Sequence, residues 1–448
     1  MFSFSIFEKS SYFFYLLILS ATIFIVDTSI AYVADFLVEF NSSLSGIILF
    51  ISLVIISTIA NFVVIKYIEN RTDSVRAKSK SVKILHLAVR IVQYVLLVNI
   101  GLVTMWILLF SQYFTDSLSL TTFISNSASA LLLGWFAYRF MLWFLSNKKS
   151  VVMLLYALSF LILSFSESMV AVGDTYLLIE KDDIISPDSE VTFYDFEEGT
   201  FFATFYDYYD YIDISAFLLM LGATSILLYS YSTKIRGIKL IIIIGLPLLS
   251  YISGYLDTLN IYDTDTNPDL FSYYVFQSLS TMSAGILFAI SVWIVVRNMS
   301  DTTIKNFMIT TAYGFILFYI TNSASVTVTP YAPFGLISLS FLPLATYLIL
   351  IGIYSSAFSL SQNISLRASI RNLASQNSNL LHNIGTSQMD VQLKNIMAKF
   401  KDKILQEESN MKEQTGISAN MEADEMEDYV KHVIKELVEN RERRQSRD

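Results

Sequence analysis

Long apolar stretches recur along residues 1–360, separated by short polar segments. A helix needs about 20 apolar residues to cross the hydrocarbon core of a bilayer. Ten stretches have about this length, and backbone inside lipid must satisfy its own hydrogen bonds, so each is expected to be an α-helix. The predicted spans are 12–34, 45–65, 84–110, 120–145, 151–173, 214–232, 238–256, 272–296, 306–327 and 333–360. The pattern predicts an all-α polytopic membrane protein with about ten transmembrane helices, and residues 1–360 form its transmembrane domain.

The basic residues fall almost entirely on one side of these spans. Residues 1–360 contain 17 Lys and Arg, and 16 of them share a side with the N-terminus, Lys181 being the exception. Cytoplasmic loops carry the excess of Lys and Arg in membrane proteins. We therefore expect a multi-pass protein of the cell membrane, with the lipid bilayer as a partner and with both termini in the cytoplasm.

One predicted outer segment, 174–213, is long and strongly acidic. It contains 12 acidic residues, one Lys and 11 Phe or Tyr. Aromatic residues beside a span are typical of the headgroup region. We expect an acidic, aromatic outer loop whose last part forms an amphipathic helix leading into the sixth span.

The last part of the chain, 361–448, is predicted to be a helical cytoplasmic tail. Its first segment, 361–384, continues the tenth span, and apolar residues recur there with the alternating spacing of a coiled coil. The residues in this register are Leu366, Ile370, Leu373, Asn377, Leu380 and Ile384. They predict a homodimer through the tail; the alternative is that the same stripe packs on later tail helices of one chain. The tail holds 13 basic and 14 acidic residues, so we expect it to dock an unidentified cytoplasmic protein rather than nucleic acid.

Carboxylates inside or beside the outer ends of the spans are candidate ligand-binding groups. Ionisable residues in lipid are costly and are functional candidates. The members of this set are Asp27, Glu167, Asp174 and Asp257, with Asp35 and Asp213 in the same region. They predict an acidic outer vestibule that binds a cation or a cationic small molecule with help from aromatic faces. The alternative is that they cap or solvate helix ends.

A second candidate cation site lies in the outer loop 257–269. Its oxygen donors alternate as in the first part of a calcium loop: Asp263, Asp265, Asn267 and Asp269. Pro268 stands where such a loop needs Gly, and Tyr274 stands where it needs Glu. The pattern is therefore incomplete.

A few other polar residues also bear on the interpretation. Arg90 and Arg139 lie near the inner surface, where snorkelling is expected, although either could pair with a carboxylate on a neighbouring span. His86 is expected to be solvated. Asn41 begins a glycosylation sequon on an outer loop, and the alternative is an unmodified polar turn.

Composition excludes many function classes. Of 448 residues, 54% are hydrophobic and 15% are charged, against about 25% charged in soluble domains. The absence of Cys and the presence of only three His exclude thiolate chemistry and multi-histidine metal sites. No nucleotide-binding or catalytic motif occurs. We expect a protein that is not an enzyme and has no cofactor or metal.

Three tail segments carry a resemblance to a known family: Ser365–Ala374, Leu380–Met389 and Glu413–Ile417. Together they resemble the shared C-terminal segment of uncharacterised polytopic membrane proteins of ammonia-oxidising archaea. That resemblance implies membrane location and no particular activity. The spans more loosely resemble the multi-helix sensory regions of membrane signalling proteins, whose last helix feeds a coiled coil.

These observations favour a non-enzymatic membrane receptor or sensor-like protein. Its acidic outer face would bind a cation or small ligand, and its last span would pass a change to the tail. Two alternatives remain at this point: a secondary transporter of a cationic or small polar solute, and a membrane scaffold subunit.

Overall fold

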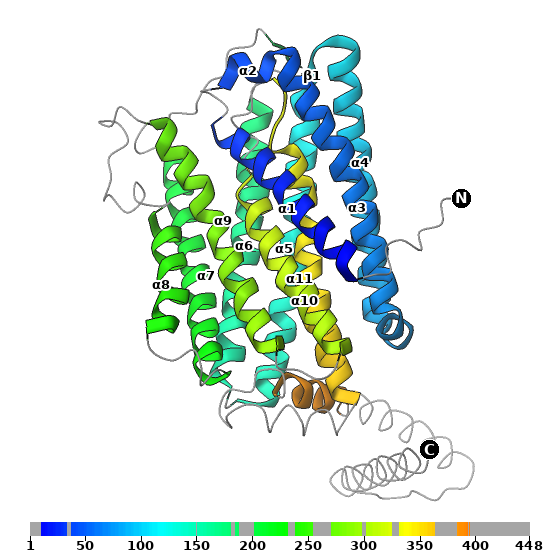
Figure 1. Ribbon diagram of the computed structural model, residues 1–448, viewed down its shortest axis with the longest axis vertical. Coiled ribbons are helices and arrows are strands. Elements are labelled where there is room, and N and C mark those ends of the chain that lie inside the picture. The colour runs from blue at the N-terminus through cyan, green and yellow to red at the C-terminus, as the bar shows by residue number, and fades with distance from the viewer. Residues whose placement is uncertain are drawn as a thin grey trace, which may run out of the picture. The chain divides into compact units, whose positions relative to one another are not determined.

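The computed structural model describes residues 10–33, 37–148, 150–180, 184–187, 201–231, 238–253, 270–297, 302–324, 331–362, 383–392 and 394. The chain divides into two compact units, Met1–Gly385 and Thr386–Asp448. All the labelled elements belong to the first unit (Figure 1). The second unit is described only at 386–392 and 394.

The first unit is a bundle of helices, seen side by side in Figure 1. The long helices are α1 (Ser10–Tyr32), α3 (Leu44–Lys78), α4 (Lys80–Phe110), α5 (Thr115–Ser146), α6 (Val151–Glu180), α7 (Phe201–Tyr231), α8 (Ile238–Ser253), α9 (Leu270–Arg297), α10 (Thr302–Asn322) and α11 (Leu336–Gln362). The connections contain the short helix α2 (Val38–Ser42) and the strands β1 (Tyr113–Phe114) and β2 (Ile184–Ile185), which pair antiparallel. Each predicted span overlaps one long helix, which confirms the all-α class.

Among the described residues, six helices are long and apolar enough to cross a membrane. They are α3, α4, α5, α6, α7 and α11. Shorter apolar stretches lie in α1, α8 and α9. The described helices therefore indicate a multi-pass membrane protein.

Helix α4 has the surface pattern of a helix that faces lipid. Exposed apolar side chains recur on it every three or four residues: Ile84, Leu87, Ile91, Val95, Val98, Leu102, Met105 and Leu109. Buried apolar side chains form a second stripe: Val82, Val89, Leu96, Val103 and Ile107. A long exposed apolar stripe on a helix is unfavourable in water, and lipid removes that cost.

Helix α11 is the buried helix of the bundle. The whole of its most apolar stretch is buried, against 33% of the corresponding stretch of α4. It contacts α10, α5, α4, α3 and α1, so protein rather than lipid surrounds it. Pro343 lies inside this helix, as the predicted tenth span requires.

Two glycines let α10 and α11 approach closely. A Cβ added at Gly314 of α10 would lie 2.6 Å from the backbone nitrogen of Ile349, and one at Gly352 of α11 would lie 2.5 Å from the carbonyl oxygen of Phe307. Small residues at helix contacts are typical of membrane bundles, where packing drives association. The pair therefore fixes how α10 and α11 lie together.

A helix is present at the end of the acidic loop, where the sequence predicts an amphipathic one. Helix α7 begins at Phe201, well before the predicted span at 214, and runs unbroken to Tyr231. Its exposed Tyr208 and Tyr211 lie in this added segment. The longer helix brings further acidic residues into the bundle at its start.

The contacts at the end of α11 do not fit a straight coiled-coil extension over 361–384. Ile384 is fully buried, and a Cβ added at Gly385 would lie 2.7 Å from Cβ of Leu360. A straight helix between Leu360 and Gly385 would separate them by about 37 Å. The other five coiled-coil residues lie outside the described residues, so the homodimer stays a prediction.

The turn between α4 and α5 is held by two stacked tyrosines. The rings of Tyr113 and Tyr331 lie 6.2 Å apart at an interplanar angle of 19°. Burial raises the pKa of the Tyr113 phenol, and the neighbouring Tyr331 raises it further. The Tyr113 phenol therefore stays neutral, as its position between two helix ends requires.

Candidate ligand site

Glu167 of α6 is a buried carboxyl with an unused oxygen. The residue is 2% exposed, and its Oε2 has no hydrogen-bond partner. A buried ionised carboxylate is costly unless it is paired or hydrogen-bonded. A bound cation, or a proton, would therefore stabilise the Glu167 carboxyl, which has no such partner among the described residues.

Two further carboxyls act electrostatically on Glu167. The Ser159 hydroxyl donates to the Ala216 carbonyl at 2.8 Å and sets the register of α6 against α7. Asp213 lies on α7, three residues before Ala216. Asp174 lies two turns further along α6, and the charges of both aspartates act on Glu167. The grouping of Glu167, Asp174 and Asp213 at one site stays a prediction.

Aromatic residues surround Asp213, which is 5% exposed. The Tyr251 hydroxyl of α8 donates a hydrogen bond to Asp213 Oδ2. The ring of Phe217 stacks on that of Tyr251 at 3.8 Å. Tyr209 lies close enough for the charges of Asp213 and Glu167 to act on its phenol. An aromatic pair, Phe217 and Tyr251, therefore adjoins Asp213.

Helix α5 faces the same site with an amide. The Ser164 hydroxyl of α6 donates to the Ala130 carbonyl of α5 at 2.8 Å. Asn126 lies one turn before Ala130, and Glu167 lies one turn after Ser164. Because the two helices form an antiparallel hairpin, both steps lead to the same depth, and each keeps to the contacting face. Asn126 is 1% exposed, and its Nδ2 has no hydrogen-bond partner.

Asp27 does not belong to this acidic group. It is fully buried on α1, and its Oδ2 accepts hydrogen bonds from the backbone N–H and the hydroxyl of Ser338, each at 2.8 Å. Ser338 is the third residue of α11, which follows Gly335 with its φ of 90°. First-turn amides lack partners within their own helix, and a helix N-terminus favours negative charge. The predicted vestibule is therefore wrong for Asp27, which caps α11.

Polar contacts also join α11 to α4 and α5. The hydroxyls of Ser129 on α5 and Thr346 on α11 lie 2.7 Å apart. On the α4 side, Gln93 Nε2 donates to the Ser340 carbonyl at 3.3 Å. The Gln93 Oε1 in turn accepts from Asn61 of α3 at 2.6 Å. These residues are uncharged, so they are not among the ionisable residues that the sequence singles out. The signal that could have found them is the presence of Asn and Gln inside apolar spans.

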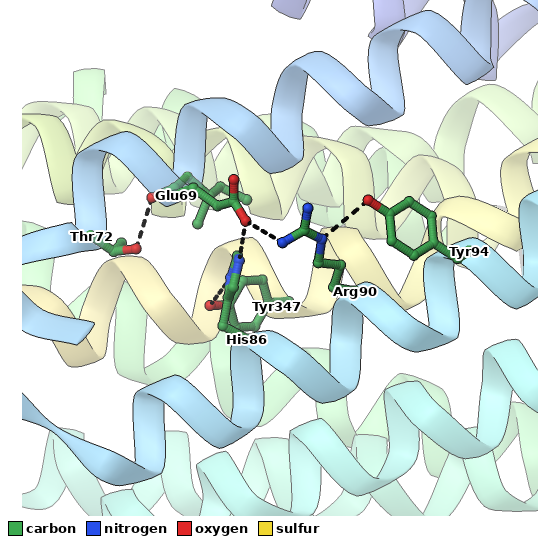
Figure 2. A network of polar contacts seen from close by, with 7 residues as sticks. Glu69, Thr72, His86, Arg90, Tyr94 and Tyr347 are labelled. Atoms are coloured by element: carbon green, nitrogen blue, oxygen red, sulfur yellow. Dashed lines mark hydrogen bonds and ion pairs between the residues drawn. The ribbon is translucent and has the colours of Figure 1, made fainter. Parts of the chain in front are cut away.

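A charged network joins α3, α4 and α11 (Figure 2). The Glu69 Oε1 lies 3.2 Å from His86 Nε2 and 2.9 Å from Arg90 Nη1. The His86 Nδ1 lies 3.1 Å from the Tyr347 hydroxyl, and Arg90 Nε donates to the Tyr94 hydroxyl at 3.1 Å. His86 is 6% exposed, so its predicted solvation is wrong. For Arg90, pairing with a carboxylate on a neighbouring span is confirmed.

The Arg139 guanidinium lies over two aromatic rings. Its guanidinium carbon lies 4.9 Å from the ring centroid of Trp135 and 5.6 Å from that of Tyr354 on α11. Stacking on aromatic faces stabilises a guanidinium. Arg139 therefore contributes a further contact between α5 and α11.

Several predicted site residues lie outside the described residues: Asp35, Asp257, Asp263, Asp265, Asn267 and Asp269. The sequon residue Asn41 is described and is fully buried, which favours the unmodified alternative. The described residues contain no group of three His, Cys, Asp or Glu side chains that could hold a metal ion.

Comparison of the chain with protein-family models, with curated proteins and with solved structures finds no match. The functional argument therefore rests on the geometry of the site and of α11.

Proposed function

We propose that the protein is a non-enzymatic membrane receptor. A cation binds at Glu167, and α11 passes the resulting change to the cytoplasmic tail. The observation that carries this proposal is the Glu167 carboxyl, which is 2% exposed, has an oxygen without a partner and is subject to the charges of Asp213 and Asp174. Three acidic groups so placed attract a positive ligand.

The surrounding sequence supports a cationic ligand. From Val151 to Tyr231 the chain contains 13 acidic residues and one basic residue, Lys181. A region lined by one sign of charge raises the local concentration of oppositely charged ligands. A cation would reach Glu167 through this acidic segment.

The contacts of α11 support its role in coupling. The site is formed by α5, α6 and α7, and α5 is joined to α11 by the Ser129–Thr346 contact of 2.7 Å. A shift of α5 on ligand binding would therefore act on a helix that protein surrounds. In the topology that we propose, with ten spans and both termini cytoplasmic, α11 ends at the cytoplasmic surface and leads into the tail.

Binding is tested with the full-length chain in lipid nanodiscs. Thermal unfolding is followed with sodium, potassium, calcium and ethylammonium chlorides. At least one cation should stabilise the wild type, and Glu167→Gln, which keeps the shape but removes the charge, should abolish that stabilisation. Glu39→Gln is the matched control, because Glu39 is an exposed acid on α2.

The proposal fails if no cation stabilises the wild type or if Glu167→Gln is stabilised equally. A secondary transporter would also use an intramembrane carboxylate. Uptake of the stabilising cation into proteoliposomes, lost in Glu167→Gln, would identify a transporter instead of a receptor. If no cation binds but the tail still binds a cytoplasmic protein, the protein would be a scaffold subunit.

A further inference from the structure

We infer that the Glu167 site takes a small organic ammonium ion that also carries a neutral oxygen acceptor, the chemistry of an amino alcohol, and that Asn126 recognises the oxygen. This inference rests on the proposed function, because it names the ligand class of the same site. It uses an observation independent of the acidic cluster, namely the unpartnered amide of Asn126.

The two unpartnered atoms have complementary hydrogen-bonding roles. Glu167 Oε2 is an acceptor and Asn126 Nδ2 is a donor, and neither has a hydrogen-bond partner. They lie on contacting faces of α5 and α6 at the same depth, because each is one turn from the Ser164–Ala130 hydrogen bond. Both residues are at most 2% exposed, and buried polar groups of this kind are normally satisfied. A ligand that satisfies both has to donate to Glu167 and accept from Asn126.

An inorganic cation satisfies only the Glu167 carboxylate. It would be attracted to the carboxylate, but the Asn126 N–H group would point at a positive charge. An ammonium group donates to Glu167 and is attracted by the neighbouring Asp213 and Asp174. A hydroxyl or ether oxygen on the same molecule accepts from Asn126. A ligand carboxylate is disfavoured as the acceptor, because the site already contains three acids.

The aromatic residues next to Asp213 suit an organic cation. Phe217 stacks on Tyr251, which donates to Asp213, and Tyr209 lies within reach of the charges of Asp213 and Glu167. Aromatic faces attract ammonium groups and also cover the carbon atoms of the ligand. The site thus offers a carboxylate, an amide donor and apolar walls.

The test compares three amines of nearly equal size: ethanolamine, 2-methoxyethylamine and propylamine. Propylamine lacks the oxygen, and 2-methoxyethylamine has an oxygen that can only accept. Apparent affinities are measured by thermal shift and by isothermal titration calorimetry on the full-length chain in nanodiscs. We expect both oxygen-bearing amines to bind about tenfold more tightly than propylamine, the effect of one hydrogen bond.

The variants assign this preference to a residue. Asn126→Leu should remove the preference, so that within this variant the three amines bind with equal affinity, because the Nδ2 donor for the ligand oxygen is gone. Glu167→Gln should abolish binding of all three amines. The comparison among amines in the wild type needs no variant, so the inference stays testable if Asn126→Leu does not fold.

Each outcome separates the two proposals. Equal affinity for all three amines, or a preference that persists in Asn126→Leu, overturns the inference. Stabilisation by inorganic cations alone also overturns it, and cation binding at Glu167 still stands. Amine binding that is unchanged in Glu167→Gln overturns both proposals.

Discussion

At the residue scale, two buried carboxyls in comparable sequence positions have different roles. Asp27 and Glu167 both lie within apolar helices and are almost fully buried. Each keeps one oxygen without a hydrogen-bond partner, but the Asp27 Oδ2 accepts two hydrogen bonds from Ser338. The partners, and not the residue type, distinguish a structural cap from a candidate ligand group.

Replacing Asp27 with Ala should therefore affect stability and leave cation binding in place. The change leaves the Ser338 N–H without its acceptor, and an unsatisfied buried donor costs about 1–3 kcal/mol. We expect a lower midpoint of thermal unfolding and an unchanged affinity for the cation that stabilises the wild type. Glu39→Ala is the exposed control and should change stability by less than about 0.5 kcal/mol. Loss of cation binding in Asp27→Ala at temperatures where the variant is folded would contradict the separation of the two roles.

At the element scale, α11 is positioned by both polar contacts and close packing. Asp27 caps its start, Thr346 and Tyr347 contact α5 and α4, and Gly314 and Gly352 bring α10 against it. These contacts lie at several points along one buried helix and join α11 to its neighbours. This arrangement is the basis for assigning the coupling to α11.

The glycines of this contact should be sensitive to the smallest enlargement. Gly352→Ala places a methyl group against the Phe307 carbonyl and Thr311 of α10, and overpacking typically costs about 1–3 kcal/mol. Gly101→Ala in α4 is the matched control, since a Cβ there meets nothing within 4 Å, and it should be neutral or stabilising by up to about 1 kcal/mol. Thermal unfolding in nanodiscs measures both. Equal effects of the two substitutions would show that α10 and α11 are not in close contact.

At the scale of the whole molecule, hydropathy predicts where the helices lie in the sequence, but it does not predict which helices contact one another. Every predicted span overlaps a helix, because apolar length is a local property of the sequence. The helix ends differ more: α3 continues to Lys78 beyond the predicted end at 65, since a helix can extend past the lipid.

The lateral arrangement was not predictable from one sequence. Asp27 and Glu167 share a predicted depth, yet Asp27 lies against α11 and Glu167 lies among α5, α6 and α7. Which helices touch depends on packing between distant segments, such as Ser338 with Asp27, which are 311 residues apart. For the same reason the sequence did not show that His86 would bond to Tyr347.

The central claim is that a ligand at Glu167 changes the tail through α11. The chain contains no cysteine, so a single cysteine introduced at Ser418 provides a unique reactive thiol in the tail. The measurement is its rate of alkylation with and without ethanolamine, or sodium chloride if only the inorganic ion binds. The account predicts that the ligand changes this rate in the wild-type background and not in Thr346→Val, which removes the hydroxyl contact with Ser129 but keeps the ligand site. An alkylation rate that stays the same while the ligand is bound, or that changes equally in Thr346→Val, would contradict it.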